Sequence, residues 1–135
     1  MKIKLINFGM KHTPQRGHYN DAGADVYVDR DVYINPHITR KIPLGFGLEL
    51  PDGYVAFVFP RSSWSSKGIV CELPPIDSGY RGEIHAVITN HTDETIKIPG
   101  GTRIGQLVVL PVVVADFVTE TGEERGSGAF GSTGE

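Results

Sequence analysis

Short runs of β-branched and aromatic residues, separated by turn residues, dominate the pattern of this 135-residue chain. Such runs at regular spacing, with almost no helical periodicity between them, are typical of an all-β sandwich or barrel. We expect strands over residues 2–8, 24–34, 39–50, 54–59, 83–90, 95–98 and 103–114. Turn signals such as Asn35-Pro36, Pro51-Asp52-Gly53 and Pro99-Gly100-Gly101 separate them.

Two of the expected strands are unusually apolar. Residues 54–59 are apolar or aromatic throughout, which predicts a strand covered on both faces. Residues 107–114 are more apolar still. A domain of this size has little interior for them, so we expect part of this run to contact another subunit. One short helix is expected over residues 62–67, opened by a serine.

The composition changes at Gly122, where glycine and hydroxyl residues become frequent. We therefore divide the chain into a β domain, residues 1–121, and a mobile C-terminal arm, residues 122–135. Composition alone would make this arm a solvated linker. However, Arg125 carries a guanidinium group, whose charge and N–H donors suit a polyphosphate. Phe130 carries an aromatic ring, which suits stacking on a nucleobase. The glycines would let backbone N–H groups approach phosphate oxygens closely.

The charge balance limits the partners of the chain. The net charge is −3 with acids and bases interspersed, and without a basic stripe nucleic acid is not expected as a partner. The single cysteine, Cys71, excludes an internal disulfide and is expected to be a buried thiol in a reducing compartment. The first residues form no long apolar stretch, which predicts a cytoplasmic chain without a membrane span. The five histidines lack metal-site spacing and are interpreted as surface or structural residues.

Two segments carry candidate catalytic chemistry. In Pro60-Arg61-Ser62-Ser63, a helical turn after a strand would offer free N–H groups, hydroxyls and one positive charge to an anion. The alternative is an ordinary serine-capped turn with a solvated arginine. In residues 74–84, Asp77 and Tyr80 flank a tight turn. The Asp77 carboxylate can act as a general base, and the Tyr80 ring can form one side of a sugar pocket. The common alternative is that Asp77 is a turn residue and Tyr80 a packing residue.

Two further polar residues stand in apolar surroundings. Asp25 follows small residues at the start of a strand and is suited to orienting a hydrated metal ion or a hydroxyl, whereas Asp21 is expected to be a solvated loop residue. Gln106 is the one polar amide in an apolar strand and needs a hydrogen-bond partner. That partner is either in the chain or in a ligand.

The order of these segments is more specific than any one of them. The series AGADVY (22–27), PRSS (60–63), PPIDSGYRGEI (74–84), GGTRIGQLVVLP (100–111) and RGSGAFGSTG (125–134) resembles the five ordered motifs of the trimeric dUTP diphosphatases, or dUTPases. The resemblance covers nearly the whole chain. It implies a jelly-roll-like distorted β-barrel, a homotrimer with active sites shared between subunits, and Mg²⁺-dependent hydrolysis of dUTP to dUMP and pyrophosphate. That activity limits uracil incorporation into DNA and supplies dUMP for thymidylate synthesis.

The resemblance also implies roles for individual residues. Asp77 would be the general base, assisted by Arg61 and Asp25, and Tyr80 would stack under the deoxyribose. No residue would bind Mg²⁺ directly, because the phosphates would hold the ion, with Asp25 and Gln106 contacting it through water. The remaining expected substrate-binding residues are Ser62, Ser63, Ile84, Gln106, Arg125, Phe130, Gly131, Ser132 and Thr133. Of these, Ile84 and its neighbours would present backbone groups to the base.

The chain departs from the family pattern at three places. Gly79 stands where an acidic residue is usual, Ser63 stands where glycine is frequent, and the loop over residues 69–76 is about two residues shorter and lacks an asparagine that reads uracil. Two alternatives stay open: a dCTP deaminase or bifunctional deaminase–dUTPase, and a nucleotide-binding regulatory β-domain. Val87 occupies the place of the deaminase glutamate, which disfavours the first. A regulatory protein partner is an additional expectation if the chain is encoded by a phage.

Overall fold

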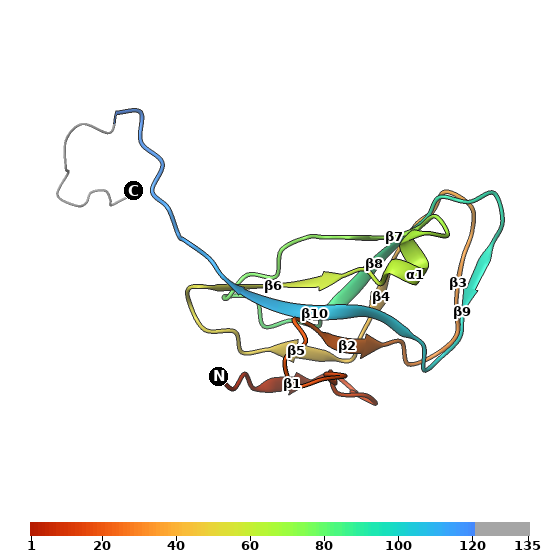
Figure 1. Ribbon diagram of the computed structural model, residues 1–135, viewed down its shortest axis with the longest axis horizontal. Helices are drawn as coiled ribbons and strands as arrows, with labels where there is room; N and C mark the ends of the chain where they lie inside the picture. The colour runs from red at the N-terminus through yellow and green to blue at the C-terminus, as the bar shows by residue number, and fades with distance from the viewer. Residues whose placement is uncertain (121–135) are drawn as a thin grey trace.

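The computed structural model describes residues 1–120 and confirms the all-β class (Figure 1). Ten strands and one short helix occupy this part of the chain. They are β1 (Leu5–Asn7), β2 (Ala24–Tyr27), β3 (Val32–Ile34), β4 (Thr39–Pro43), β5 (Phe46–Leu48), β6 (Tyr54–Phe59), α1 (Ser62–Ser65), β7 (Ile69–Glu72), β8 (His85–Asn90), β9 (Ile96–Ile98) and β10 (Arg103–Pro111). The arm expected over residues 122–135 lies outside the described residues.

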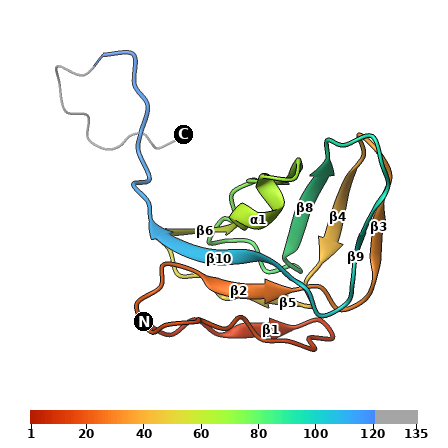
Figure 2. The same cartoon turned by 45° about the vertical axis from the view of Figure 1, so that its right-hand side comes forward.

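The strands form small antiparallel sheets whose members come from distant parts of the sequence. Their orders are β1-β5, β2-β10-β6, β3-β9 and β4-β8-β7. Figure 2 shows β4 and β8 rising beside the layer that contains β2 and β10. None of the four sheets within residues 1–120 closes on itself, so the expected barrel is open in the described part of the chain.

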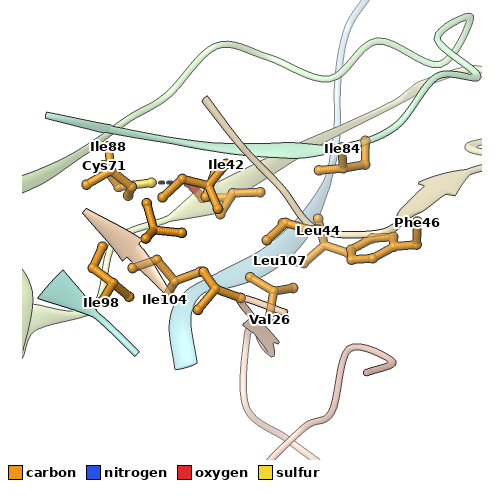
Figure 3. Packing of buried hydrophobic residues seen from close by; sticks show 14 of the residues in the cluster. Val26, Ile42, Leu44, Phe46, Cys71, Ile84, Ile88, Ile98, Ile104 and Leu107 are labelled. Atoms are coloured by element: carbon orange, nitrogen blue, oxygen red, sulfur yellow. Dashed lines mark hydrogen bonds between the residues drawn. The ribbon is translucent and has the colours of Figure 1, made fainter. Parts of the chain in front are cut away.

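The two three-stranded sheets share one hydrophobic core (Figure 3). Val26 and Leu107 come from the first sheet, and Ile42, Ile88 and Cys71 come from the second. Burying one such aliphatic side chain stabilises the fold by roughly 1.5–3 kcal/mol. The Cys71 thiol donates a hydrogen bond to the Val58 carbonyl at 3.3 Å, and its burial raises the pKa of the thiol to about 11. The prediction that Cys71 is buried is confirmed.

Several expected strand boundaries are wrong. The run expected over residues 24–34 is two strands, because the charged residues Asp29, Arg30 and Asp31 form a turn between β2 and β3. The run expected over residues 39–50 breaks at Gly45, whose φ of 84° belongs to the left-handed region. Strand β7 was expected to be loop. It forms because Ile69 and Cys71 are buried and the strand pairs with β8.

The local details of β6 and α1 also differ from expectation. Strand β6 is not fully covered: buried Ala56 and Val58 alternate with half-buried neighbours such as Phe57. The residue at the N-cap of α1 is Arg61 rather than a serine, and no side chain caps the helix. Among residues 1–120, no helix combines the length and apolarity that crossing a membrane would require.

The apolar run at the end of β10 leaves the body of the domain (Figure 1). Strand β10 ends at Pro111, and the following Val113 and Val114 are 85% and 83% exposed. Phe117 is 94% exposed. An apolar segment this exposed is typical of a subunit contact, and the expected contact with another subunit stays a prediction.

Candidate active site

Strand β10 places Gln106 between two neighbours from distant segments. Gln106 lies opposite Asp25 of β2 on one side and Phe59 of β6 on the other. Arg61 and Ser62 follow Phe59 by two and three residues, where β6 ends and α1 begins. The sheet therefore gathers three of the sequence-predicted segments, which we call the sheet cluster: Asp25, Arg61, Ser62, Ser63 and Gln106.

Two glycines make room for this arrangement. A Cβ at Gly23 would lie 2.8 Å from the Cβ of Gln106 and 3.0 Å from its amide oxygen. A Cβ at Gly105 would lie 2.8 Å from the Phe59 carbonyl oxygen. Real Cβ atoms essentially never lie closer than 3.0 Å to another heavy atom, so a side chain at Gly105 would push β10 away from β6, and one at Gly23 would displace the Gln106 side chain. The amide of Gln106 fills the space that Gly23 leaves open.

Asp25 is held in place by an arginine that sequence reasoning missed. The Arg103 guanidinium donates to Asp25 Oδ2 at 3.2 Å, and the Asp25 side chain is 20% exposed. Arg103 lies opposite Tyr27 in the β10–β2 pairing. Only strand pairing could show this contact, because the two residues are 78 positions apart. Asp21, by contrast, is exposed and accepts the His18 N–H at 2.8 Å, which lowers the pKa of its carboxyl group and confirms a loop role.

The short helix α1 presents polar groups at its start. The Arg61 carbonyl accepts the N–H groups of Trp64 and Ser65 at 3.0 and 3.2 Å. The N–H groups of Ser62 and Ser63 therefore have no partner within residues 1–120, and both serines are exposed. Arg61 is half-buried beside them. Free N–H groups, hydroxyls and one guanidinium make this turn suited to an anion.

Asp77 stands on a turn whose two ends are fixed. On one side Ile76 exchanges backbone hydrogen bonds with Ala56 of β6, at 2.9 and 3.1 Å. On the other side the Tyr80 N–H donates to the Asp77 carbonyl at 3.0 Å, which closes the turn as the sequence predicted. The Ser78 hydroxyl donates to Asp52 at 3.2 Å. The Asp77 carboxylate is exposed on this anchored turn.

The Tyr80 ring folds back over the same turn. Its hydroxyl donates to the Glu83 carbonyl at 2.7 Å. A Cβ at Gly82 would meet this hydroxyl at 2.5 Å and the ring carbon Cζ at 2.7 Å. Gly82 is therefore the residue that permits the ring to lie flat against the backbone, where it is 44% exposed.

A gap opens where β7 leaves β8. The pairing ends at Glu72 opposite Val87, and four residues later the chain pairs with β6 at Ile76. The Ile84 N–H donates to Phe46 and its carbonyl accepts from Leu44. Because hydrogen-bond direction alternates along a strand, the backbone groups of His85 point toward the gap. Of the backbone groups expected to face a ligand at Ile84 and its neighbours, those of Ile84 are thus paired within the chain, and those of His85 face the gap.

The gap forms a pocket of ≈ 190 Å³, which we call the turn pocket. It contains the predicted residues Asp77, Tyr80 and Ile84. Four charged or titratable residues that sequence reasoning did not assign to a site also line it: Lys41, Glu72, Glu83 and His85. Nothing local could have revealed Lys41, because it reaches the pocket only through the pairing of β4 with β8.

The structure therefore brings the predicted residues together in two places rather than one. Asp77, Tyr80 and Ile84 line the turn pocket, whereas no member of the sheet cluster lines it. The other predicted residues, Arg125, Phe130, Gly131, Ser132 and Thr133, lie outside the described residues. Among the described residues, each place therefore contains only part of the predicted set.

Comparison with known proteins shows the family of this chain. A sequence model of the family described as dUTPase matches residues 10–134. The deoxyuridine 5'-triphosphate nucleotidohydrolase of Tropheryma whipplei (strain Twist) is 43% identical over 142 residues, covering 99% of this chain and 96% of that protein. A variant of the Staphylococcus bacteriophage 80alpha dUTPase with dUpNHpp superimposes with a TM-score of 0.81 at 28% identity, covering 99% of each chain.

A second solved structure shares the fold at lower identity. It is a variant of the dUTPase from phage phi11 of S. aureus, with a TM-score of 0.81 and 24% identity, covering 91% of this chain and 98% of that one. That structure describes the coordination of a structural Mg(II) ion.

Proposed function

This chain belongs to the dUTPase family, and from that premise we propose that it hydrolyses dUTP to dUMP and pyrophosphate with Asp77 as the general base. One observation carries the proposal: Asp77 and Tyr80 are fixed by a single turn at the mouth of one pocket of ≈ 190 Å³. Neither alternative is favoured, because the named relatives are nucleotidohydrolases and because Val87, which cannot transfer a proton, lines the pocket.

Asp77 would act on the water that attacks the α-phosphorus. Asp77 is exposed, lines the pocket and sits on a backbone anchored on both sides, so its carboxylate is accessible to a water molecule there. General-base assistance of this kind accelerates a reaction about 10²–10⁴-fold. The anchored turn would place the carboxylate where it can hold the attacking water in line with the bond that breaks.

Tyr80 would select the deoxyribose. Its ring is held against the turn by the hydrogen bond to the Glu83 carbonyl, so it cannot retreat from a sugar stacked on it. A 2′-hydroxyl on that sugar would meet the ring and be rejected. The backbone N–H of His85 faces the gap beyond the sugar, where it can donate to a carbonyl oxygen of the base.

The sheet cluster would bind the triphosphate. Arg61 and the free N–H groups of Ser62 and Ser63 suit phosphate oxygens. The residues also fit Mg²⁺ held mainly by phosphates, because Mg²⁺ commonly uses one or two carboxylates plus substrate phosphates and Asp25 supplies a carboxylate opposite Gln106. Asp25 and Gln106 would contact its water shell. When bound, the ion neutralises phosphate charge.

We further propose a homotrimer in which each site combines residues of different subunits. The separation of the sheet cluster from the turn pocket supports this: the proposed mechanism needs both sets of groups around one substrate, and no member of the sheet cluster lines the pocket. The exposed apolar run at Val113, Val114 and Phe117 supports it as well. Arg125, Phe130, Gly131, Ser132 and Thr133 would close over the nucleotide, and their roles stay predictions.

A complementation experiment tests the function and the sharing together. Asp77→Asn and Arg61→Ala subunits should each bind dUTP and release pyrophosphate at least about 10²-fold more slowly than the parent. Co-expressed subunits should regain activity, because a mixed oligomer contains some sites with both residues intact. Full activity of Asp77→Asn would remove this residue as the base. Two inactive variants without recovery on mixing would place the whole site in one chain.

A further inference from the structure

The turn pocket contains two charged side chains that the proposed mechanism leaves unused. Lys41 and Glu72 lie opposite Val87 on its two sides, Lys41 from β4 and Glu72 from β7. Directly opposite residues in an antiparallel sheet share a face, so the two charges flank Val87 on the wall of the pocket. Within residues 1–120 neither of them forms an ion pair.

Glu72 is held by a chain of hydroxyl groups. The Thr89 hydroxyl donates to Glu72 Oε2 at 2.9 Å, and the hydroxyls of Thr39 and Thr89 are 2.7 Å apart. Because the single proton of Thr89 goes to Glu72, Thr39 must donate to Thr89. Thr89 is only 7% exposed, so this chain is fixed in the sheet. Oε2 of Glu72 is thereby held by Thr89, Oε1 accepts no hydrogen bond within residues 1–120, and Glu72 lines the turn pocket.

We propose that Glu72 is a specificity-determining residue that reads the base by accepting the N3–H of uracil on Oε1. The inference rests on the proposed function and names how the same pocket selects its substrate. Uracil presents an N–H between two carbonyl oxygens on this edge, so a carboxylate accepts its central N–H and the Lys41 ammonium donates to a flanking oxygen. Cytosine presents an unprotonated N3 at that position, which a carboxylate repels.

The fixed position of Glu72 makes the site discriminate uracil from cytosine, instead of binding both bases. A free carboxylate side chain would shift to accept the amino group of cytosine instead. Thr89 prevents this shift by fixing Oε2, and Tyr80, held by its hydrogen bond to the Glu83 carbonyl, would limit movement of the sugar. Thr89 is accordingly a positioning residue, which acts through Glu72 without touching the base.

Substitution of Glu72 provides the test. Glu72→Gln replaces one carboxylate oxygen by an amide that can donate to cytosine N3. We expect kcat/KM for dUTP to fall about ten- to hundredfold, the range for a lost hydrogen bond to a charged group, and the dUTP:dCTP ratio of kcat/KM to fall further. Thr89→Val should lower the same ratio to a smaller extent, whereas Thr89→Ser, which keeps the hydroxyl, should restore it. Glu49→Gln, outside the pocket lining, is the matched control.

The outcomes separate this inference from the proposed function. If the parent protein releases no pyrophosphate from dUTP, the proposed function fails. If the parent is active and Glu72→Gln keeps the parental dUTP:dCTP ratio, the inference is overturned and the function stands. Thermal unfolding checks that each variant is folded. If Glu72→Gln does not fold, the contrast between Thr89→Val and Thr89→Ser decides, and equal ratios for these two overturn the proposal.

Discussion

Replacing Gly82 by alanine tests how the Tyr80 ring reads the sugar without altering the ring itself. The new Cβ would lie 2.5 Å from the Tyr80 hydroxyl, 2.7 Å from Cζ and 3.0 Å from Cε1. Ordinary contact begins at 3.4 Å, so the end of the ring must withdraw by about 0.9 Å. That movement breaks the 2.7 Å hydrogen bond between the Tyr80 hydroxyl and the Glu83 carbonyl.

The displacement predicts a specific kinetic change. The lost hydrogen bond weakens the turn by about 0.5–1.5 kcal/mol, which leaves the domain folded. A misplacement of about 1 Å in a catalytic site can lower the rate about 10²-fold. We therefore expect kcat/KM for dUTP to fall about ten- to hundredfold. The ratio of dUTP to UTP turnover should fall too, because a displaced ring no longer blocks the 2′-hydroxyl.

The same turn contains a matched control. A Cβ at Gly79 would meet no atom within 4 Å, and its φ is not in the left-handed region. Gly79→Ala should therefore keep both activity and selectivity. The assay is pyrophosphate release from dUTP and UTP by the parent and both variants, with thermal unfolding as the folding check. If the dUTP:UTP turnover ratios of Gly82→Ala and Gly79→Ala are equal, the position of the Tyr80 ring does not exclude the 2′-hydroxyl.

Three further predictions concern other parts of the molecule. Gly23→Ala should lower dUTP turnover with little change in strand content, because the new Cβ would displace the Gln106 side chain; unchanged steady-state kinetics would exclude Gln106 from the site. Truncation before Arg125 should leave a folded oligomer, seen by light scattering, that does not turn over dUTP; an active truncated protein would remove the arm from the mechanism. The third follows from the raised pKa of Cys71, about 11 in the folded state. The stability gained by keeping the thiol protonated is complete below pH ~9 and disappears as the pH rises toward 11, a loss of roughly 2 kcal/mol. Denaturant unfolding at pH 8 and 11 should show a smaller decrease for Cys71→Ala than for the parent, and equal decreases would contradict this explanation.

Local sequence signals predicted the elements that depend on neighbouring residues. The apolar run of β6, the turn between Asp77 and Tyr80 and the short helix at Ser62 were all visible in the sequence. Strand β7 was missed, because a segment ending in Glu72-Leu73-Pro74-Pro75 has the composition of a loop. Its strand conformation comes from pairing with β8 and from burial of Ile69 and Cys71.

The sequence by itself determined the all-β class, the candidate chemistry of Asp77, Tyr80 and Gln106, and the resemblance that led to the family. Only the tertiary structure decided which of these residues meet. Asp25 and Arg103 are 78 positions apart, and Thr39 and Thr89 are 50 positions apart. Such contacts depend on strand register, which the whole core selects, because a slip by one residue would turn every buried side chain toward solvent. The turn pocket, its separation from the sheet cluster and the fixed carboxylate of Glu72 all follow from that register.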